Sequence, residues 1–94
     1  VQAGRGDLKS AIADLTQAIK LRPNYADAFY NRGKARTESK DVNGAIADFT
    51  AAIRLDSDLA EAYGNRGLLY AQTGNKKSAL QDLQTAAKLF QQQG

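Results

Sequence analysis

The sequence predicts an all-α fold, a solenoid of about five helices that pair as antiparallel hairpins. The first observation is an internal repeat, because residues 26–33 return with few changes as residues 60–67, a shift of 34 positions. The second is the spacing of apolar residues at i, i+3, i+4 and i+7, which places them on one face of a helix. A fixed period of this length is typical of stacked helical hairpins, each of which buries its apolar face against its neighbours.

The first helix is expected to begin at Asp7 and to end at residues 21–23. Asp7 is a candidate N-cap, because its carboxylate can accept hydrogen bonds from the free amides of the first turn. Gly6, in the turn of residues 5–7, can adopt the left-handed conformation that precedes such a cap. Pro23 cannot continue a helix, so the chain is expected to turn there.

Four further helices are expected over residues 25–38, 41–55, 59–72 and 75–90. The connections between paired helices are short enough to fold them back antiparallel. Small residues are expected where paired helices cross most closely, and large apolar residues are expected to fill the space between helices. The small residues are Ala11, Gly33, Ala45, Gly67 and Ala79, and the large ones are Leu15, Phe29, Phe49, Tyr63, Tyr70 and Leu83.

Composition excludes several function classes. The chain has 94 residues, which suits a single domain over residues 1–94. It has no Cys and no His, so we expect no disulfide, no metal site, no cofactor and no nucleophile–base pair, and hence no enzyme. No apolar run approaches the roughly 20 residues that cross a bilayer, so no membrane partner is expected. The net charge of +3 is dispersed along the chain, which makes nucleic-acid binding the lesser alternative.

Residue types at fixed places in the repeat indicate a family. Each unit has an aromatic residue, a small residue four positions later, then alanines and a large apolar residue on its second helix. These places hold Phe29, Gly33, Ala45, Phe49 and Ala52 in one unit, and Tyr63, Gly67, Ala79, Leu83 and Ala86 in the next. In this pattern the chain resembles the tetratricopeptide repeat, with a partial first repeat at residues 1–25, a second at residues 26–59 and a third at residues 60–94. Lys40 stands where the family has a turn glycine, so a left-handed Lys40 is expected, at a cost of about 1 kcal/mol.

The resemblance implies a right-handed superhelix in which the first helix of each repeat lines a concave groove for a peptide or a partner protein. The inward positions are Asp27, Tyr30, Asn31, Lys34, Thr37, Glu38, Glu61, Gly64, Asn65, Leu68, Ala71 and Gln72, and all except Thr37, Gly64 and Ala71 are candidate ligand contacts. Asn31 and Asn65 are candidates for gripping a peptide main chain, because an amide both donates and accepts hydrogen bonds. The alternative is that these amides satisfy backbone groups between repeats. Tyr30, facing Gly64 and Leu68, predicts a shallow apolar spot for one partner side chain.

Two further rows of side chains recur once per repeat. Arg32 and Arg66 are one repeat apart, as are Asp14, Asp48 and Asp82. We expect each arginine to pair with an aspartate of its own or the preceding repeat, because a guanidinium fork matches a carboxylate. The alternative is that the two rows are solvated independently.

The start of the chain predicts an open end. Only residues 1–3 remain of the first repeat's leading helix, so Leu8, Ile12 and Leu15 are expected to expose an apolar stripe, a candidate self-association surface for a homo-oligomer. The chain is expected to be a fragment of a longer array from a cytoplasmic protein. Its expected function is that of a non-catalytic protein–protein interaction scaffold that binds an extended peptide or a partner helix. The alternative is a structural module that stacks or exchanges helices with other copies.

Overall fold

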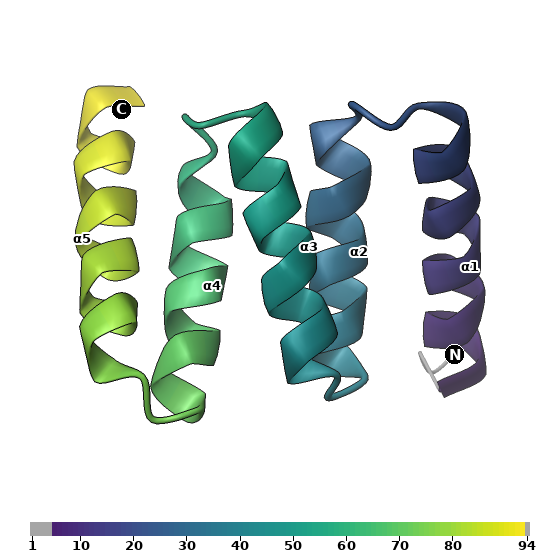
Figure 1. Ribbon diagram of the computed structural model, residues 1–94, viewed down its shortest axis with the longest axis horizontal. Coiled ribbons are helices and arrows are strands. Elements are labelled where there is room, and N and C mark those ends of the chain that lie inside the picture. The colour runs from purple at the N-terminus through teal and green to yellow at the C-terminus, as the bar shows by residue number, and fades with distance from the viewer. Residues whose placement is uncertain (1–4, 94) are drawn as a thin grey trace.

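The computed structural model describes residues 5–93, which form five α-helices and no strand. The helices are α1 (Arg5–Leu21), α2 (Ala26–Glu38), α3 (Val42–Leu55), α4 (Ala60–Gln72) and α5 (Lys76–Gln93). Each helix packs against the next one in sequence, and Figure 1 shows them side by side in chain order with alternating directions. The particle measures 34 × 28 × 23 Å. The predicted solenoid of helix hairpins is confirmed, while residues 1–3 lie outside the described residues.

The helix boundaries follow the prediction to within one residue except at the start of α1 and at the end of α5, which continues to Gln93 instead of residue 90. Helices α2 to α5 each begin one residue after the expected start. At α3 the reason is a cap, because Asp41 is the N-cap and its side chain accepts a hydrogen bond of 3.0 Å from the amide of Gly44. Helix α1 begins at Arg5, so the expected turn at residues 5–7 is wrong and Asp7 lies in the first helical turn instead of capping it. An acidic side chain is stabilising anywhere in the first turn, so its position does not fix the residue at which a helix begins.

The turns inside the two complete hairpins have the same backbone conformation. Lys40 has φ 67° and its repeat equivalent Gly74 has φ 84°, which confirms the left-handed conformation predicted for Lys40. In each turn the next amide donates back to the preceding helix, from Asp41 to Arg36 at 2.8 Å and from Asn75 to the equivalent carbonyl at 2.9 Å. This pattern ends a helix after one left-handed residue and directs the chain into the returning helix.

Alanines and one aromatic ring form the centre of the core. Phe49 is fully buried and packs with Ala45, Ala62 and Leu69. A Cβ atom on Gly33 would lie 3.0 Å from the ring of Phe49, which confirms that this crossing needs a small residue. The repeat equivalents of this pair are Gly67 and Leu83. A Cβ atom on Gly67 would likewise lie 3.0 Å from Leu83, but Leu83 is 38% exposed because no described helix follows α5.

The predicted arginine–aspartate pairs are present in both complete repeats. Arg32 donates from Nε to Asp48 Oδ2 at 2.9 Å and from Nη2 to Asp48 Oδ1 at 2.7 Å. Its Nη1 donates to the hydroxyl of Thr16 at 3.1 Å, and Arg36 adds a third bond to Asp48 at 3.0 Å. The aspartate therefore belongs to the arginine's own repeat, and the preceding repeat contributes a threonine.

The next repeat builds the same arginine–aspartate–threonine contacts from equivalent residues, without a counterpart of Arg36, whose place Tyr70 takes. Arg66 donates from Nε and Nη2 to the two carboxylate oxygens of Asp82 at 2.7 and 2.8 Å, and from Nη1 to Thr50 at 3.2 Å. The hydrogen bonds to Asp82 raise the pKa of Arg66 above its ordinary value, so the guanidinium stays charged. The alternative of two separately solvated rows is wrong for these pairs. Asp14, the equivalent of both aspartates, is exposed and has no arginine partner among the described residues.

The first helix is less open than the sequence predicts. Leu8, Ile12 and Leu15 are each half-buried, so the apolar stripe expected on them is partly covered. The exposed large apolar side chains include Leu21 at the end of α1, which is 75% exposed, and Leu80 and Phe90 on α5. Self-association through α1 stays a prediction.

Candidate functional site

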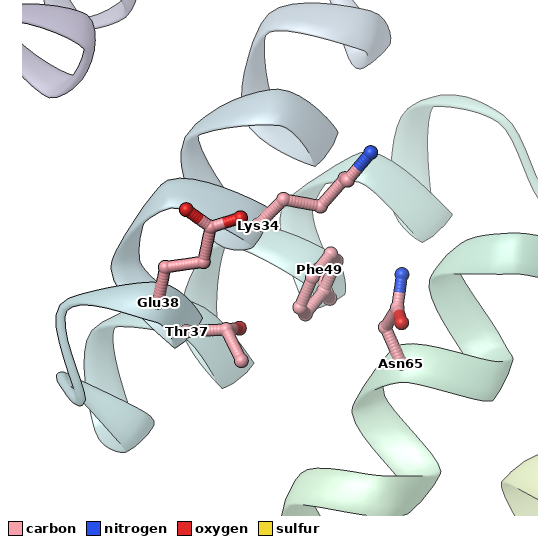
Figure 2. A pocket seen from close by; sticks show the side chains of 5 residues that line it. All are labelled: Lys34, Thr37, Glu38, Phe49 and Asn65. Atoms are coloured by element: carbon pink, nitrogen blue, oxygen red, sulfur yellow. The ribbon is translucent and has the colours of Figure 1, made fainter. Parts of the chain in front are cut away.

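Two hollows lie along the first helices of the hairpins, α2 and α4. The smaller has a volume of about 160 Å³ and lies between the two helices. Figure 2 shows its lining, with Lys34, Thr37 and Glu38 from α2, Phe49 from α3 and Asn65 from α4 around it. Its rim carries one cation and one anion, and the ring of Phe49 forms its floor.

The larger hollow has a volume of about 300 Å³ and extends from α2 across α4 to α5. It is lined by Tyr30, Glu61, Gly64, Asn65, Leu68, Leu83 and Phe90. Most of this surface is apolar, and Leu83 and Phe90 on α5 are 38% and 49% exposed, since no described helix follows α5. The second hollow is therefore an apolar depression with an acidic residue at its edge.

Asn65 lines both hollows and joins two repeats. Its Nδ2 donates a hydrogen bond of 3.2 Å to the hydroxyl of Tyr30 on α2. An asparagine amide can donate two hydrogen bonds and accept two, so one donor and the carbonyl oxygen remain for a ligand. The predicted inter-repeat contact of this amide is therefore found, but to a side chain instead of to backbone.

Tyr30 is held in place by neighbours on two helices. Its ring packs against Phe49 with 5.7 Å between centroids and a tilt of 58°. The ammonium group of Lys34 lies 5.5 Å from the centre of the same ring, a distance at which a cation is attracted to an aromatic face. This packing fixes the Tyr30 hydroxyl beside Asn65.

The structure brings together part of the predicted groove. Six of the nine candidate contacts line one or both hollows, and these are Tyr30, Lys34, Glu38, Glu61, Asn65 and Leu68. The other three, Asp27, Asn31 and Gln72, are exposed on the same helices but line neither hollow.

Five lining residues were not among the candidate contacts, and two of them, Thr37 and Gly64, were expected only as inward positions of the groove. Phe49 and Leu83 were expected only as filling between helices, and Phe90 was not assigned a role. Phe90 follows Leu83 by seven residues, which is the spacing of one helical face, so the apolar periodicity could have identified it.

The described part of the chain holds no cluster of three or more His, Cys, Asp or Glu side chains that could bind a metal ion. None of its helices combines the length and the apolar character that crossing a bilayer requires. The chemistry that the two hollows offer is hydrogen bonding, one cation, two anions and apolar contact.

Family models match nearly the whole chain. A model described as TPR repeat matches residues 4–40 and 33–74, and a model described as Tetratricopeptide repeat matches residues 60–93. The chain belongs to the tetratricopeptide repeat family. No curated protein sequence gives a significant match.

Solved structures of the same fold are similar over most of the chain. The crystal structure of MamA is 26% identical with a TM-score of 0.89, and the match covers 93% of this chain and 51% of that one. YrrB, described as a TPR protein with an unusual peptide-binding site, is 27% identical with a TM-score of 0.81, over 89% of this chain and 43% of that one. The second TPR of Spaghetti (RPAP3), bound to the HSP90 peptide SRMEEVD, is 30% identical with a TM-score of 0.86, over 89% of this chain and 78% of that one. The chain thus spans about half the length of the MamA chain.

Proposed function

We propose that this chain is a non-catalytic protein-interaction module that binds an extended peptide along the groove formed by the two hollows. The observation that carries the proposal is the position of Asn65, which lines both hollows. A peptide that lies across α4 can place one side chain in each hollow. Its main chain between those two side chains then passes over the amide of Asn65.

The main chain of such a peptide supplies the groups that Asn65 can still bind. The free carbonyl oxygen of Asn65 accepts from a peptide N–H, and its second amide hydrogen donates to a peptide carbonyl. The Tyr30 hydroxyl accepts from Asn65 and keeps its own hydrogen for a second peptide carbonyl. These contacts give affinity without depending on the peptide sequence, as in other main-chain recognition.

Selectivity comes from the hollows. The smaller one places Lys34 and Glu38 at its rim, which suits a polar or charged side chain, and the larger one suits an apolar side chain. Peptide binding by the structurally similar YrrB and RPAP3 domains supports a peptide as the ligand class.

An array of short synthetic peptides of varied sequence, probed with the purified chain, tests this proposal. Asn65→Ala is expected to weaken binding of the selected peptides by about tenfold, because two hydrogen bonds to the ligand are lost. Asn31→Ala is the matched control, since it removes the same amide at the equivalent position outside both hollows. Circular dichroism verifies that both variants stay folded. Equal effects of the two substitutions, or no peptide bound by the unaltered chain, would contradict the proposal.

A further inference from the structure

We propose that the larger hollow is a specificity pocket for an aromatic side chain that has a basic residue next to it in the bound peptide. Gly64 is the residue that opens the pocket, and Glu61 is the residue that selects the basic neighbour. This inference rests on the proposed function, because the aromatic side chain belongs to the peptide in the groove.

In the preceding repeat, the place that corresponds to this pocket is occupied by a side chain of the chain itself, that of Tyr30. Tyr30 contacts Phe49 and Lys34 in the second repeat. A shift of one repeat converts these three residues into Gly64, Leu83 and Leu68, all of which line the larger hollow. The hollow therefore occupies the place that the tyrosine ring fills one repeat earlier. A ring supplied by a ligand would cover the same kind of surface.

The floor of the pocket is open to a large group. A Cβ atom on Gly64 would have Ala86 as its nearest contact, at an ordinary 3.8 Å, so no atom blocks the space above the α4 backbone. The volume of about 300 Å³ is at the lower end of the range for small-molecule sites, which suits one large side chain. Phe90 is 49% exposed at its wall and offers a ring for an edge-to-face contact.

Charge complementarity selects the neighbouring residue of the ligand. Among the residues that line this hollow, Glu61 alone carries a charge. It lies one helical turn before Gly64, so it faces the same side of α4. The cation of the groove, Lys34, lies 5.5 Å from the centre of the Tyr30 ring and lines the smaller hollow, not this one. A lysine or arginine beside the aromatic residue therefore meets a carboxylate, whereas an acidic residue there meets a like charge.

A tryptophan peptide tests the pocket without background, because this chain contains no Trp. The probe is a short peptide with a single Trp next to a Lys, and burial of its indole shifts the emission to shorter wavelength. A second peptide has Glu in place of Lys. A third has Leu in place of Trp and is measured by competition. Titration of the unaltered chain is expected to rank the Lys–Trp peptide first.

Substitution at position 64 tests the place of binding. Gly64→Tyr restores the side chain of the preceding repeat and is expected to weaken binding of the Lys–Trp peptide by about tenfold or more, because the pocket is filled from within. Gly64→Ala adds one methyl group and leaves most of the pocket open, so it is expected to weaken binding much less than Gly64→Tyr does. Glu61→Gln is expected to abolish the preference for Lys over Glu, a few-fold effect for an exposed ion pair, while Asp27→Asn at the equivalent position on α2 does not. Circular dichroism controls for folding.

Four results would overturn the pocket. The first two are equal binding by the Gly64→Tyr variant and the unaltered chain, and equal binding of the Lys and Glu peptides. The third is competition by the Leu peptide that is as strong as competition by the Trp peptide. The fourth is a concentration-dependent dimer that the Gly64→Tyr substitution dissociates. The last would make a second copy the occupant. If array peptides bind in a manner that depends on Asn65, while binding of the Trp peptide is unchanged by substitution at position 64, the pocket proposal is wrong and the groove proposal is retained. If neither kind of peptide binds, both proposals fail.

Discussion

The pair of Arg66 and Asp82 is expected to act as one unit, so its two residues should be energetically coupled. The perturbation is a cycle of three variants, Arg66→Leu, Asp82→Ala and the double substitution. Arg66→Leu removes the guanidinium and leaves a buried carboxylate without its two charge-assisted hydrogen bonds. Asp82→Ala leaves the guanidinium without its carboxylate. The double variant removes both charges and leaves neither group unpaired.

The magnitude follows from burial and from the remaining contacts. The side chain of Asp82 is 9% exposed, and loss of its partner is expected to cost about 3 kcal/mol, the lower end of the range for breaking a buried pair. The side chain of Arg66 is 17% exposed and lies 5.7 and 5.6 Å from the rings of Tyr63 and Tyr70, so Asp82→Ala is expected to cost about 2 kcal/mol. The double variant is expected to lose about 3 kcal/mol, not the sum of the single losses, which gives a coupling of about 2 kcal/mol.

Urea unfolding followed by far-ultraviolet circular dichroism measures these differences. With a slope of about 1 kcal/mol per molar urea, a coupling of this size moves the midpoint of the double variant about 2 M above the additive expectation. Asp14→Ala is the matched control, because Asp14 is the repeat equivalent of Asp82 but is exposed, so no measurable change is expected. Additivity within about 0.5 kcal/mol would refute the coupling.

The remaining predictions concern glycine positions. Lys40→Gly is expected to raise the free energy of unfolding by about 1 kcal/mol, and Gly74→Lys to lower it by about as much, because both residues have positive φ and nothing lies within 4 Å of a Cβ atom on Gly74. Opposite signs in urea unfolding check this, and a loss of stability in Lys40→Gly would contradict it. Gly33→Ala is expected to lose about 1–2 kcal/mol, because the ring of Phe49 that it meets is fully buried. Gly67→Ala is also expected to lose about 1 kcal/mol, because its Cβ atom would meet Leu83 at 3.0 Å and the Cβ of buried Asp82 at 3.1 Å, and Arg66 holds that aspartate in place. An unchanged urea midpoint for this variant would refute that reasoning.

The helices and turns could be predicted because their determinants are local. The left-handed conformation of Lys40 follows from its place in the repeat, and the crossing at Gly33 follows from the size of one residue. The beginning of α1 could not be predicted in the same way. Asp7 is favourable both as a cap and inside the first turn, so the sequence does not decide between them.

The groove could be predicted only in part, because its residues depend on neighbouring repeats. Asn31 and Asn65 are equivalent in sequence, and the family pattern gives them the same role. In the structure, Asn65 binds Tyr30, which lies 35 residues earlier on the first helix of the preceding repeat. No described helix occupies that place for Asn31, so the two amides have different surroundings. Periodicity predicts where a residue lies in its own repeat, but the contacts that the residue makes also depend on whether a preceding repeat packs against it.

The polar network and the groove depend on the same helix spacing. Most of the buried apolar residues are alanines, whose small side chains restrain the sliding of one hairpin along another less than large side chains such as Phe49 do. Arg66 supplies that restraint, because it binds Thr50 on α3 and Asp82 on α5 from its position on α4. We infer that these directional hydrogen bonds also specify the register of neighbouring hairpins, besides the coupling energy that they contribute. Asn65 is the adjacent residue on α4, so the register that Arg66 fixes also sets the distance from Asn65 to Tyr30. Arg66 thus helps to position the adjacent amide of Asn65 in the groove.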